Sequence, residues 1–224
     1  MNDLFALHLK ADVISFADDT SLLYSALTKE DVLNEYEHDQ SILLPWFKEN
    51  MMHLNINKCK FMIYAYKCPD WAEDFKIEME STKIEKVANI KYFGVVIDEK
   101  LTWQKHSEHL QKKLRKQNYI FYHLKNYLNS WQLQKLYSPL YESILNYGII
   151  HWGGSAHIQP LKVLQNKVCR MILSMGRRTW EAEIYHKMNK LKLENVYKTR
   201  LLMLLLLLLL FRMFRAFISY FNIQ

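Results

Sequence analysis

The spacing of apolar residues changes between the two halves of this 224-residue chain. Up to about residue 98, short apolar runs and period-two alternation predict strands at 13–16, at 21–24 and through 75–98. From about residue 105, apolar residues recur every three or four positions, which predicts helices. The pattern therefore predicts an α+β fold, with a small antiparallel sheet followed by a mostly helical part.

A helix and two further strand signals complete the first half. Thr28 is expected to cap a helix that continues to about residue 50, because acidic residues occupy its first turn. Pro45 is expected to kink this helix or split it in two. Residues 54–56 and 61–66 read as strand.

Three amphipathic helices are predicted in the second half. The first begins near Ser107 as its cap, the second begins near Ser130 and bends at Pro139, and the third covers about 160–173. Their apolar stripes, which include Leu110, Leu114, Phe121, Leu133, Tyr137, Tyr141, Leu161, Leu164, Val168 and Ile172, predict a common core. The last part contains eleven consecutive apolar residues, 201–211, between two arginines. We expect a helix there that is too short to span a membrane, with a weak interfacial anchor as the alternative.

Charge is distributed unevenly along the chain, whose net charge is +7. Residues 1–50 hold ten acidic and three basic residues, whereas the remainder holds 13 acidic and 27 basic residues. A basic C-terminal part suits a polyanionic partner, although a solvated lysine-rich helix surface has the same composition. The acidic part suits a metal-binding site or an exposed acidic helix.

The cysteines and histidines give no metal-site pattern. Cys59, Cys68 and Cys169 fit neither a disulfide framework nor a zinc-ligand spacing, and none of the nine histidines pairs with a cysteine at such a spacing. They indicate reduced thiols and therefore an intracellular protein, in the cytoplasm or nucleus. No signal peptide is recognisable at the N-terminus.

Two adjacent carboxylates, Asp18 and Asp19, lie between the apolar runs 13–16 and 21–24. The short gap predicts a hairpin with both aspartates at its tip. Adjacent like charges repel unless a cation neutralises them, and oxygen ligands select Mg²⁺ or Mn²⁺. Such a pair can hold the ions of a two-metal phosphoryl-transfer site. The alternative is a solvated acidic turn.

The order of motifs gives the chain a family resemblance. Residues 16–20 (Phe-Ala-Asp-Asp-Thr) resemble the aromatic-x-Asp-Asp box of reverse transcriptases, and residues 54–60 (Leu-Asn-Ile-Asn-Lys-Cys-Lys) resemble a later stretch of the same palm domain. Residues 90–98 are similar to the primer-grip hairpin. The segments similar to the thumb of non-LTR, LINE-like (Jockey-type) retrotransposon polymerases are 101–106, 145–148, 152–153 and 161–167. The resemblance covers roughly residues 1–200.

This resemblance implies a partial reverse-transcriptase palm at 1–100, a helical thumb or connection region at 101–200, and a leucine-rich tail at 201–224. It also implies an RNA-directed DNA polymerase that uses an RNA template, a DNA primer, deoxynucleoside triphosphates and Mg²⁺ or Mn²⁺. In this family the fingers, the first catalytic aspartate and a template-gripping glycine-rich segment precede the Asp-Asp box. We therefore expect the chain to correspond to the C-terminal half of a polymerase and to be inactive alone.

The resemblance assigns catalytic roles to three residues. Asp18 and Asp19 would be the metal ligands, with Asp18 the direct one. Lys58 would approach the pyrophosphate, or it is an ordinary surface lysine.

It also assigns nucleic-acid contacts. Tyr92, Phe93 and Gly94 would form the primer grip, unless they are an ordinary buried hairpin; a glycine there lets a nucleic-acid backbone come close. The residues expected to meet duplex phosphates are Lys112, Lys113, Arg115 and Lys116.

Three functions compete on the sequence alone. The first is a reverse-transcriptase portion that is inactive by itself. The second is a nucleic-acid-binding remnant without chemistry. The third is a membrane-associated helical protein based on the leucine run.

Overall fold

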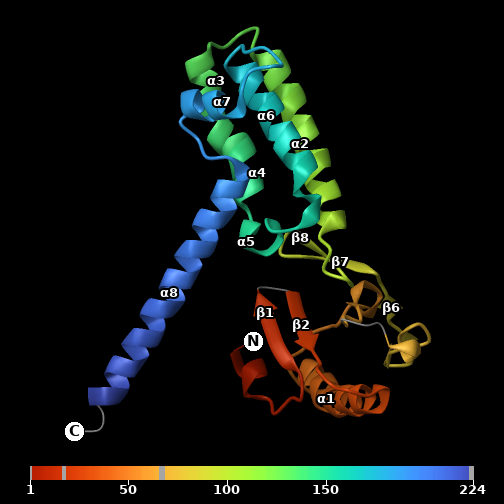
Figure 1. The fold of residues 1–224 in the computed structure, drawn as a ribbon. Coiled ribbons are helices and arrows are strands. Elements are labelled where there is room, and N and C mark those ends of the chain that lie inside the picture. The colour runs from red at the N-terminus through yellow and green to blue at the C-terminus, as the bar shows by residue number, and fades with distance from the viewer. Residues whose placement is uncertain (1, 17–18, 66–68, 222–224) are drawn as a thin grey trace. The chain divides into compact units, whose positions relative to one another are not determined.

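The computed structural model describes residues 2–16, 19–65 and 69–221 (Figure 1). It combines helices with short strands, which confirms the α+β class. The chain forms two compact units, Met1–Ala88 and Asn89–Gln224. The 89–98 hairpin packs with the helices that follow it, although the family resemblance groups it with the palm. The assignment of palm and thumb subdomains stays a prediction.

The first unit contains the predicted hairpin. Strands β1 (Asp12–Phe16) and β2 (Asp19–Leu23) pair antiparallel, with Phe16 opposite Asp19. The preceding 3₁₀ turn η1 (Asn2–Ala6) contributes Leu4, which is buried with Leu43 and Trp46. The hairpin is thus anchored to a small apolar core at its own end of the chain.

Helix α1 (Lys29–Glu49) follows the hairpin and begins where the sequence predicts. The Thr28 hydroxyl accepts a hydrogen bond from the Asp31 N–H at 3.1 Å, which satisfies one of the free donors of the first turn. Pro45 lies inside the helix, so the expected split is not observed. Pro45 and Ser41 face solvent, and water can bond the Ser41 carbonyl that Pro45 leaves without an N–H donor.

The rest of the first unit consists of short elements, and the strand predictions at 54–56 and 61–66 are largely wrong. Of residues 61–65 only Phe61 lies in a strand, and residue 66 lies outside the described residues. Residues 56–58 form a 3₁₀ turn, η2 (Ile56–Lys58), closed by a bond from the Lys58 N–H to the Asn55 carbonyl. Asn55 and Asn57 favour such a turn over a strand. The remaining elements are β3 (Lys60–Phe61), η3 (Asp70–Ala72), β4 (Glu78–Met79), β5 (Thr82–Lys83) and β6 (Glu85–Lys86).

These strands do not join into one sheet. Across both units, the strands that the structure describes form four separate two-stranded pairs. The β3–β6 pair is parallel and the other three are antiparallel. The prediction of a small antiparallel sheet is therefore replaced by isolated ladders. A two-stranded ladder of this length is not stable alone, so each depends on the side chains packed around it.

The second unit opens with the hairpin of β7 (Asn89–Tyr92) and β8 (Val95–Asp98). Phe93 and Gly94 form its two-residue turn with φ angles of 44° and 77°. Two positive φ values give the turn a twist that matches the flanking strands.

Helix α2 (Gln104–Leu124) starts earlier than the predicted Ser107 cap. The Asp98 carboxylate accepts hydrogen bonds from the N–H groups of Thr102 and Trp103, at 2.9 and 2.8 Å, and so organises the chain before the helix. Ser107 lies within the helix and donates its hydroxyl to the His157 carbonyl at 2.6 Å. Ser107 therefore joins two segments and does not cap α2.

The other helices match the predicted pattern closely. The bend expected at Pro139 is a π-helical segment, η4 (Ser138–Glu142), and the third predicted helix is α6. An Asn129–Gln132 capping box begins α3. The elements after α2 are α3 (Ser130–Tyr137), η4, α4 (Ser143–Asn146), α5 (Ile149–Trp152), η5 (Ala156–Ile158), α6 (Gln159–Ile172), α7 (Glu181–Met188) and α8 (Leu193–Phe221).

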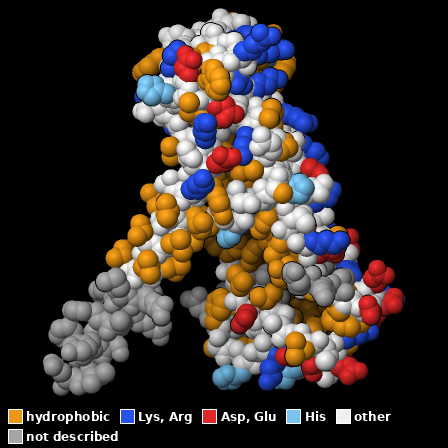
Figure 2. All heavy atoms as spheres, viewed as in Figure 1, with side chains coloured by type: hydrophobic (Ala, Val, Ile, Leu, Met, Phe, Trp, Pro, Cys, Tyr) orange, Lys and Arg blue, Asp and Glu red, His pale blue; other side chains and the backbone are white. Residues whose placement is uncertain are grey.

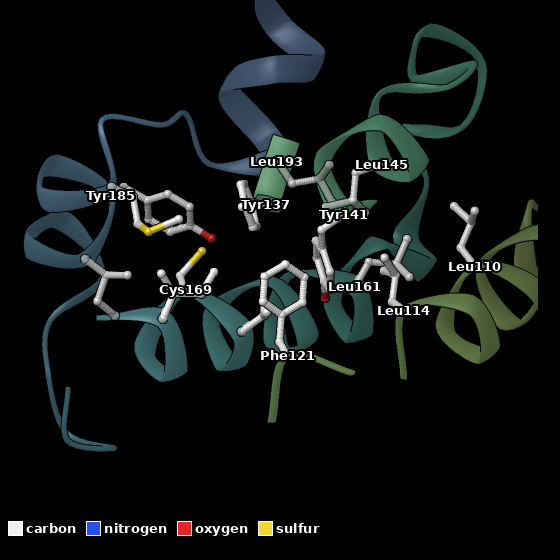
Figure 3. Packing of buried hydrophobic residues seen from close by; sticks show 14 of the residues in the cluster. Leu110, Leu114, Phe121, Tyr137, Tyr141, Leu145, Leu161, Cys169, Tyr185 and Leu193 are labelled. Atoms are coloured by element: carbon white, nitrogen blue, oxygen red, sulfur yellow. The ribbon is translucent and has the colours of Figure 1, made fainter. Parts of the chain in front are cut away.

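The core of the second unit lies between α2, α6 and the helices around Pro139. Figure 3 shows Phe121, Tyr141 and Leu161 packed together, with Tyr137 and Cys169 beside them. A buried amide connects these layers: Gln165 donates to the Tyr137 hydroxyl at 3.0 Å and accepts from the Leu193 N–H at 3.2 Å. Its hydrogen bonds fix where α8 begins.

Helix α8 contains the leucine run as predicted. Leu202 to Leu210 are exposed along it. Among the residues that the structure describes, no helix has both the length and the apolar character that crossing a bilayer requires. Of the cysteines, Cys59 and Cys169 are free, and Cys68 lies outside the described residues.

Candidate functional site

The hairpin of β1 and β2 presents oxygen atoms near its tip. Asp19 is exposed as the first residue of β2, and the hydroxyls of Ser15 and Thr20 lie 3.2 Å apart across the strands. Asp18 lies outside the described residues. Carboxylate and hydroxyl oxygens are hard donors of the kind that Mg²⁺ and Mn²⁺ prefer, so the donor set fits the expected ions.

The structure does not by itself show a metal centre. Across residues 2–16, 19–65 and 69–221, no three His, Cys, Asp or Glu side chains are grouped so that they could hold an ion. The assignment of Asp18 and Asp19 as metal ligands therefore stays a prediction.

A buried carboxylate supports the hairpin from α1. Asp39 is 0% exposed and accepts hydrogen bonds from the Lys10 and Ala11 N–H groups, each at 2.8 Å. Its Oδ1 also lies 3.0 Å from His38 Nδ1. Burial alone would raise the pKa of Asp39, but the bonds from Lys10, His38 and Ala11 together lower it. An ionised Asp39 thus holds the chain that enters β1.

Sequence reasoning missed Asp39, although a signal was present. Tyr36, Leu43 and Trp46 form the buried stripe of α1, and Asp39 lies in that stripe at helical spacing. An acidic residue on a buried face needs partners, because an unpaired buried charge is costly.

Lys58 is exposed at the end of η2. The loop before it, residues 53–57, lines a shallow hollow of about 430 Å³ together with Thr82. Nothing in this geometry distinguishes a pyrophosphate contact from an ordinary surface lysine, so the role of Lys58 also stays a prediction.

The predicted primer-grip turn packs against a loop that the sequence placed in the thumb region. The Tyr147 hydroxyl donates to the Phe93 carbonyl. A Cβ added to Gly94 would lie 3.3 Å from the Tyr147 ring, and one added to Gly148 would lie 3.1 Å from the Val95 side chain. The two glycines therefore leave room for a side chain of the facing segment, and Gly94 is also exposed to solvent.

The four basic residues expected to meet phosphates all face solvent from α2. Lys112, Lys113, Arg115 and Lys116 are exposed, opposite the buried stripe of Leu110 and Leu114. Figure 2 shows lysine and arginine side chains along this side of the unit.

The positive charge of this surface is not balanced locally. In the described part of the chain, no ion pair neutralises any of the four side chains, and the sole acidic residue of α2, Glu108, pairs with Lys105. An uncompensated row of cations on one helix face suits contacts with phosphates.

Comparison with known proteins agrees with the motif order. The chain is 26% identical over 199 residues to the RNA-directed DNA polymerase from mobile element jockey of Drosophila melanogaster, which covers 82% of this chain. It is 25% identical over 175 residues, or 75% of this chain, to a probable RNA-directed DNA polymerase from transposon X-element of the same organism. A third relative, a probable RNA-directed DNA polymerase from transposon BS, is 26% identical over 73% of the chain. The resemblance predicted from the motifs is confirmed.

The match covers a small part of these relatives. The chain spans 21%, 19% and 18% of the jockey, X-element and BS proteins respectively, or about a fifth of their length. No protein-family model matches the chain, and no solved structure is significantly similar to it.

Proposed function

We propose that this chain provides the Asp-Asp hairpin, the primer grip and the nucleic-acid-binding thumb of a reverse transcriptase of a non-LTR retrotransposon. The observation that supports this most strongly is its similarity to three RNA-directed DNA polymerases over 73–82% of its length. The hairpin of residues 12–23 agrees with the proposal, because Phe16 lies opposite Asp19 and the predicted ligand Asp19 is thus the first residue of the second strand.

The reaction would be nucleotidyl transfer, in which a primer 3′-hydroxyl attacks the α-phosphate of an incoming nucleotide. Mg²⁺ or Mn²⁺, when bound, would lower the pKa of the hydroxyl and neutralise the leaving pyrophosphate. Asp18 and Asp19 would hold the ions through their carboxylates. Lys58 would place a cation or a proton donor near the leaving group.

The remaining residues would position the nucleic acid. Gly94 is exposed, so a primer backbone would be able to approach it closely. The rings of Tyr92 and Phe93, whose centroids lie 4.1 Å apart, precede it in the hairpin. The α2 cations would bind phosphates, which positions a strand without reading its sequence.

Chemistry by these 224 residues alone is not expected. Two-metal transfer in this family uses at least three carboxylates, and only Asp18 and Asp19 match them in this sequence. The chain by itself is therefore proposed to bind nucleic acid without extending it.

The salt dependence of binding tests this function. Lys112, Lys113, Arg115 and Lys116 are changed together to Gln, and binding to a labelled duplex is measured by fluorescence anisotropy over a range of salt concentrations. The slope of log K against log salt should flatten, by up to roughly 0.9 for each phosphate that the variant no longer neutralises.

A charge-matched control separates local contacts from net charge. The double variant Lys112→Gln/Lys116→Gln is compared with Lys76→Gln/Lys83→Gln, which removes two exposed lysines from the first unit. The first pair should weaken binding and the second should not. Equal effects, or binding that ignores salt, would contradict the proposal.

A further inference from the structure

The outward face of α2 continues beyond its basic residues as an aromatic surface. Tyr119 and Tyr122 are 66% and 52% exposed, and they follow Lys116 and Arg115 at spacings of three to seven residues. Residues three or four apart lie on one helix face, so the rings continue the row of cations along the axis. The distance along the helix from Lys112 to Tyr122 is about 15 Å.

These rings are not part of the core. The buried cluster of the second unit takes Phe121 from this stretch of α2 and leaves Tyr119 and Tyr122 outside. Trp131, in the first turn of α3, is also 66% exposed. Exposed rings that lie next to one another, as Tyr119 and Tyr122 do on α2, are typical of interaction sites.

A further ring and two lysine ammonium groups contact these aromatic side chains. The His123 ring lies 4.3 Å from the Tyr119 ring and 5.6 Å from the Tyr122 ring, both edge to face. The Lys125 ammonium lies 4.4 Å from the centre of the Tyr122 ring, and the Lys135 ammonium lies 5.4 Å from that of Trp131. The α2 tyrosines therefore have the row from Lys112 to Lys116 before them in the helix and the Lys125 ammonium after them.

We propose that this face of α2 binds single-stranded nucleic acid, with unpaired bases stacked on Tyr119 and Tyr122 and phosphates on the row from Lys112 to Lys116. The inference rests on the proposed nucleic-acid binding and adds the strandedness of the ligand. Exposed rings beside a cationic track bind unpaired bases, because every base offers a π face. A duplex hides those faces in its own stack, so the rings can serve only a strand with free bases.

The experiment uses three probes and two kinds of substitution in the full chain. The probes are a labelled oligothymidylate, an abasic oligonucleotide of equal length, and a blunt duplex. Tyr119 and Tyr122 are changed together to Leu, which removes the π faces, or together to Phe, which keeps them. Tyr64→Leu, at a tyrosine that is 60% exposed in the first unit, is the matched control.

The Leu variant should bind oligothymidylate more weakly, by roughly fivefold to 150-fold for each base that loses its stacking partner. The Phe variant and the Tyr64 control should bind it as the unaltered chain does. Binding of the abasic strand and the duplex should be unchanged in all three, because neither presents unpaired bases.

The outcomes separate this inference from the proposed function. If the Leu variant binds oligothymidylate normally while the four-cation variant does not, the stacking inference is wrong and phosphate binding stands. The rings would then be free for another partner, such as a protein. An equal loss for the abasic strand would also overturn it. If the four-cation variant binds all three probes normally, the proposed function itself fails.

Discussion

At the scale of single residues, Asp39 provides two acceptor oxygens for two backbone donors, the N–H groups of Lys10 and Ala11. In Asp39→Asn, one of those oxygens becomes an NH₂ group that faces a donor. Leaving a buried N–H unbonded costs about 1–3 kcal/mol, so we expect a loss of about 2 kcal/mol in the stability of the first unit. Amide hydrogen exchange of residues 12–16 and 19–23 measures it.

The pH dependence of this stability loss tests whether the ionised carboxylate of Asp39 causes it. The pKa of Asp39 is lowered in the folded chain, so its contribution is present above the unfolded pKa of about 3.9 and is lost as pH falls through the folded value. The difference between the unaltered chain and Asp39→Asn should therefore shrink only in acid. Glu37→Gln, at an exposed position of the same helix, should change exchange little. A difference that persists below the folded pKa would contradict this account.

In the second unit, His106 is a buried titratable side chain that joins two elements, as Asp39 does in the first. Its Nδ1 accepts a hydrogen bond from the Val96 N–H at 3.2 Å, and this bond joins β8 to α2. Burial, with smaller effects of His109 and Lys113, lowers the pKa of His106 from 6.5 to about 4. The neutral ring is therefore the form that the fold selects.

Stability of the second unit should fall as pH drops through that range. Between 6.5 and about 4 the unfolded chain binds a proton at His106 and the folded chain does not, so protons favour unfolding. The loss should approach about 3 kcal/mol, because each unit of lowered pKa corresponds to about 1.4 kcal/mol, and thermal unfolding at a series of pH values measures it. His106→Gln should flatten the dependence and His151→Gln, at an exposed site, should not. Equal slopes for both variants would exclude His106 as the cause.

At the scale of elements, the β1–β2 hairpin is predicted to bind Mn²⁺ weakly, because water must complete the coordination shell around two carboxylates. Mn²⁺ should broaden the amide signals of residues next to the tip, including Ser15 and Thr20. Asp18→Ala with Asp19→Ala should abolish the broadening.

Asp12 offers the control for this measurement, since it is exposed at the opposite end of the same hairpin. Asp12→Ala should leave the broadening intact. If the double variant still shows it, these aspartates are not the ligands.

Local chemistry explains which elements could be predicted. The hairpin and α1 have their signals within a few residues: adjacent apolar runs in one case and the Thr28 cap in the other. The predicted start of α2 is wrong because Asp98 organises residues 102 and 103 before the helix, and no side chain caps α2 itself. Sequence patterns identify a serine that can cap, but they do not show whether it does.

The residues of the candidate site also separate into those that a local motif can identify and those that only packing brings together. Asp18, Asp19, Lys58 and Gly94 could be named because they lie in ordered motifs. Asp39 could not, because its partners Lys10 and Ala11 are 29 and 28 residues away in the chain. Contacts of that range depend on packing, which no local pattern contains.

At the scale of the whole molecule, the purified chain is predicted not to extend a primer. A poly(rA) template with an oligo(dT) primer and Mg²⁺ should give no product, since two carboxylates cannot hold both ions in line for transfer. The jockey RNA-directed DNA polymerase, assayed in parallel, is the positive control. Template-dependent product that disappears in Asp18→Asn would show that the 224 residues are sufficient for catalysis.

Helix α8 has one more property that follows from its composition. Leu204 to Leu210 are seven identical side chains, exposed around the helix. Advancing this stretch by one residue, with a turn of about 100° and a shift of about 1.5 Å, produces nearly the same surface again. A molecule that contacts it therefore finds several equivalent registers. The leucines can contribute adhesion, but an interface made from them alone has no means of fixing rotation or alignment.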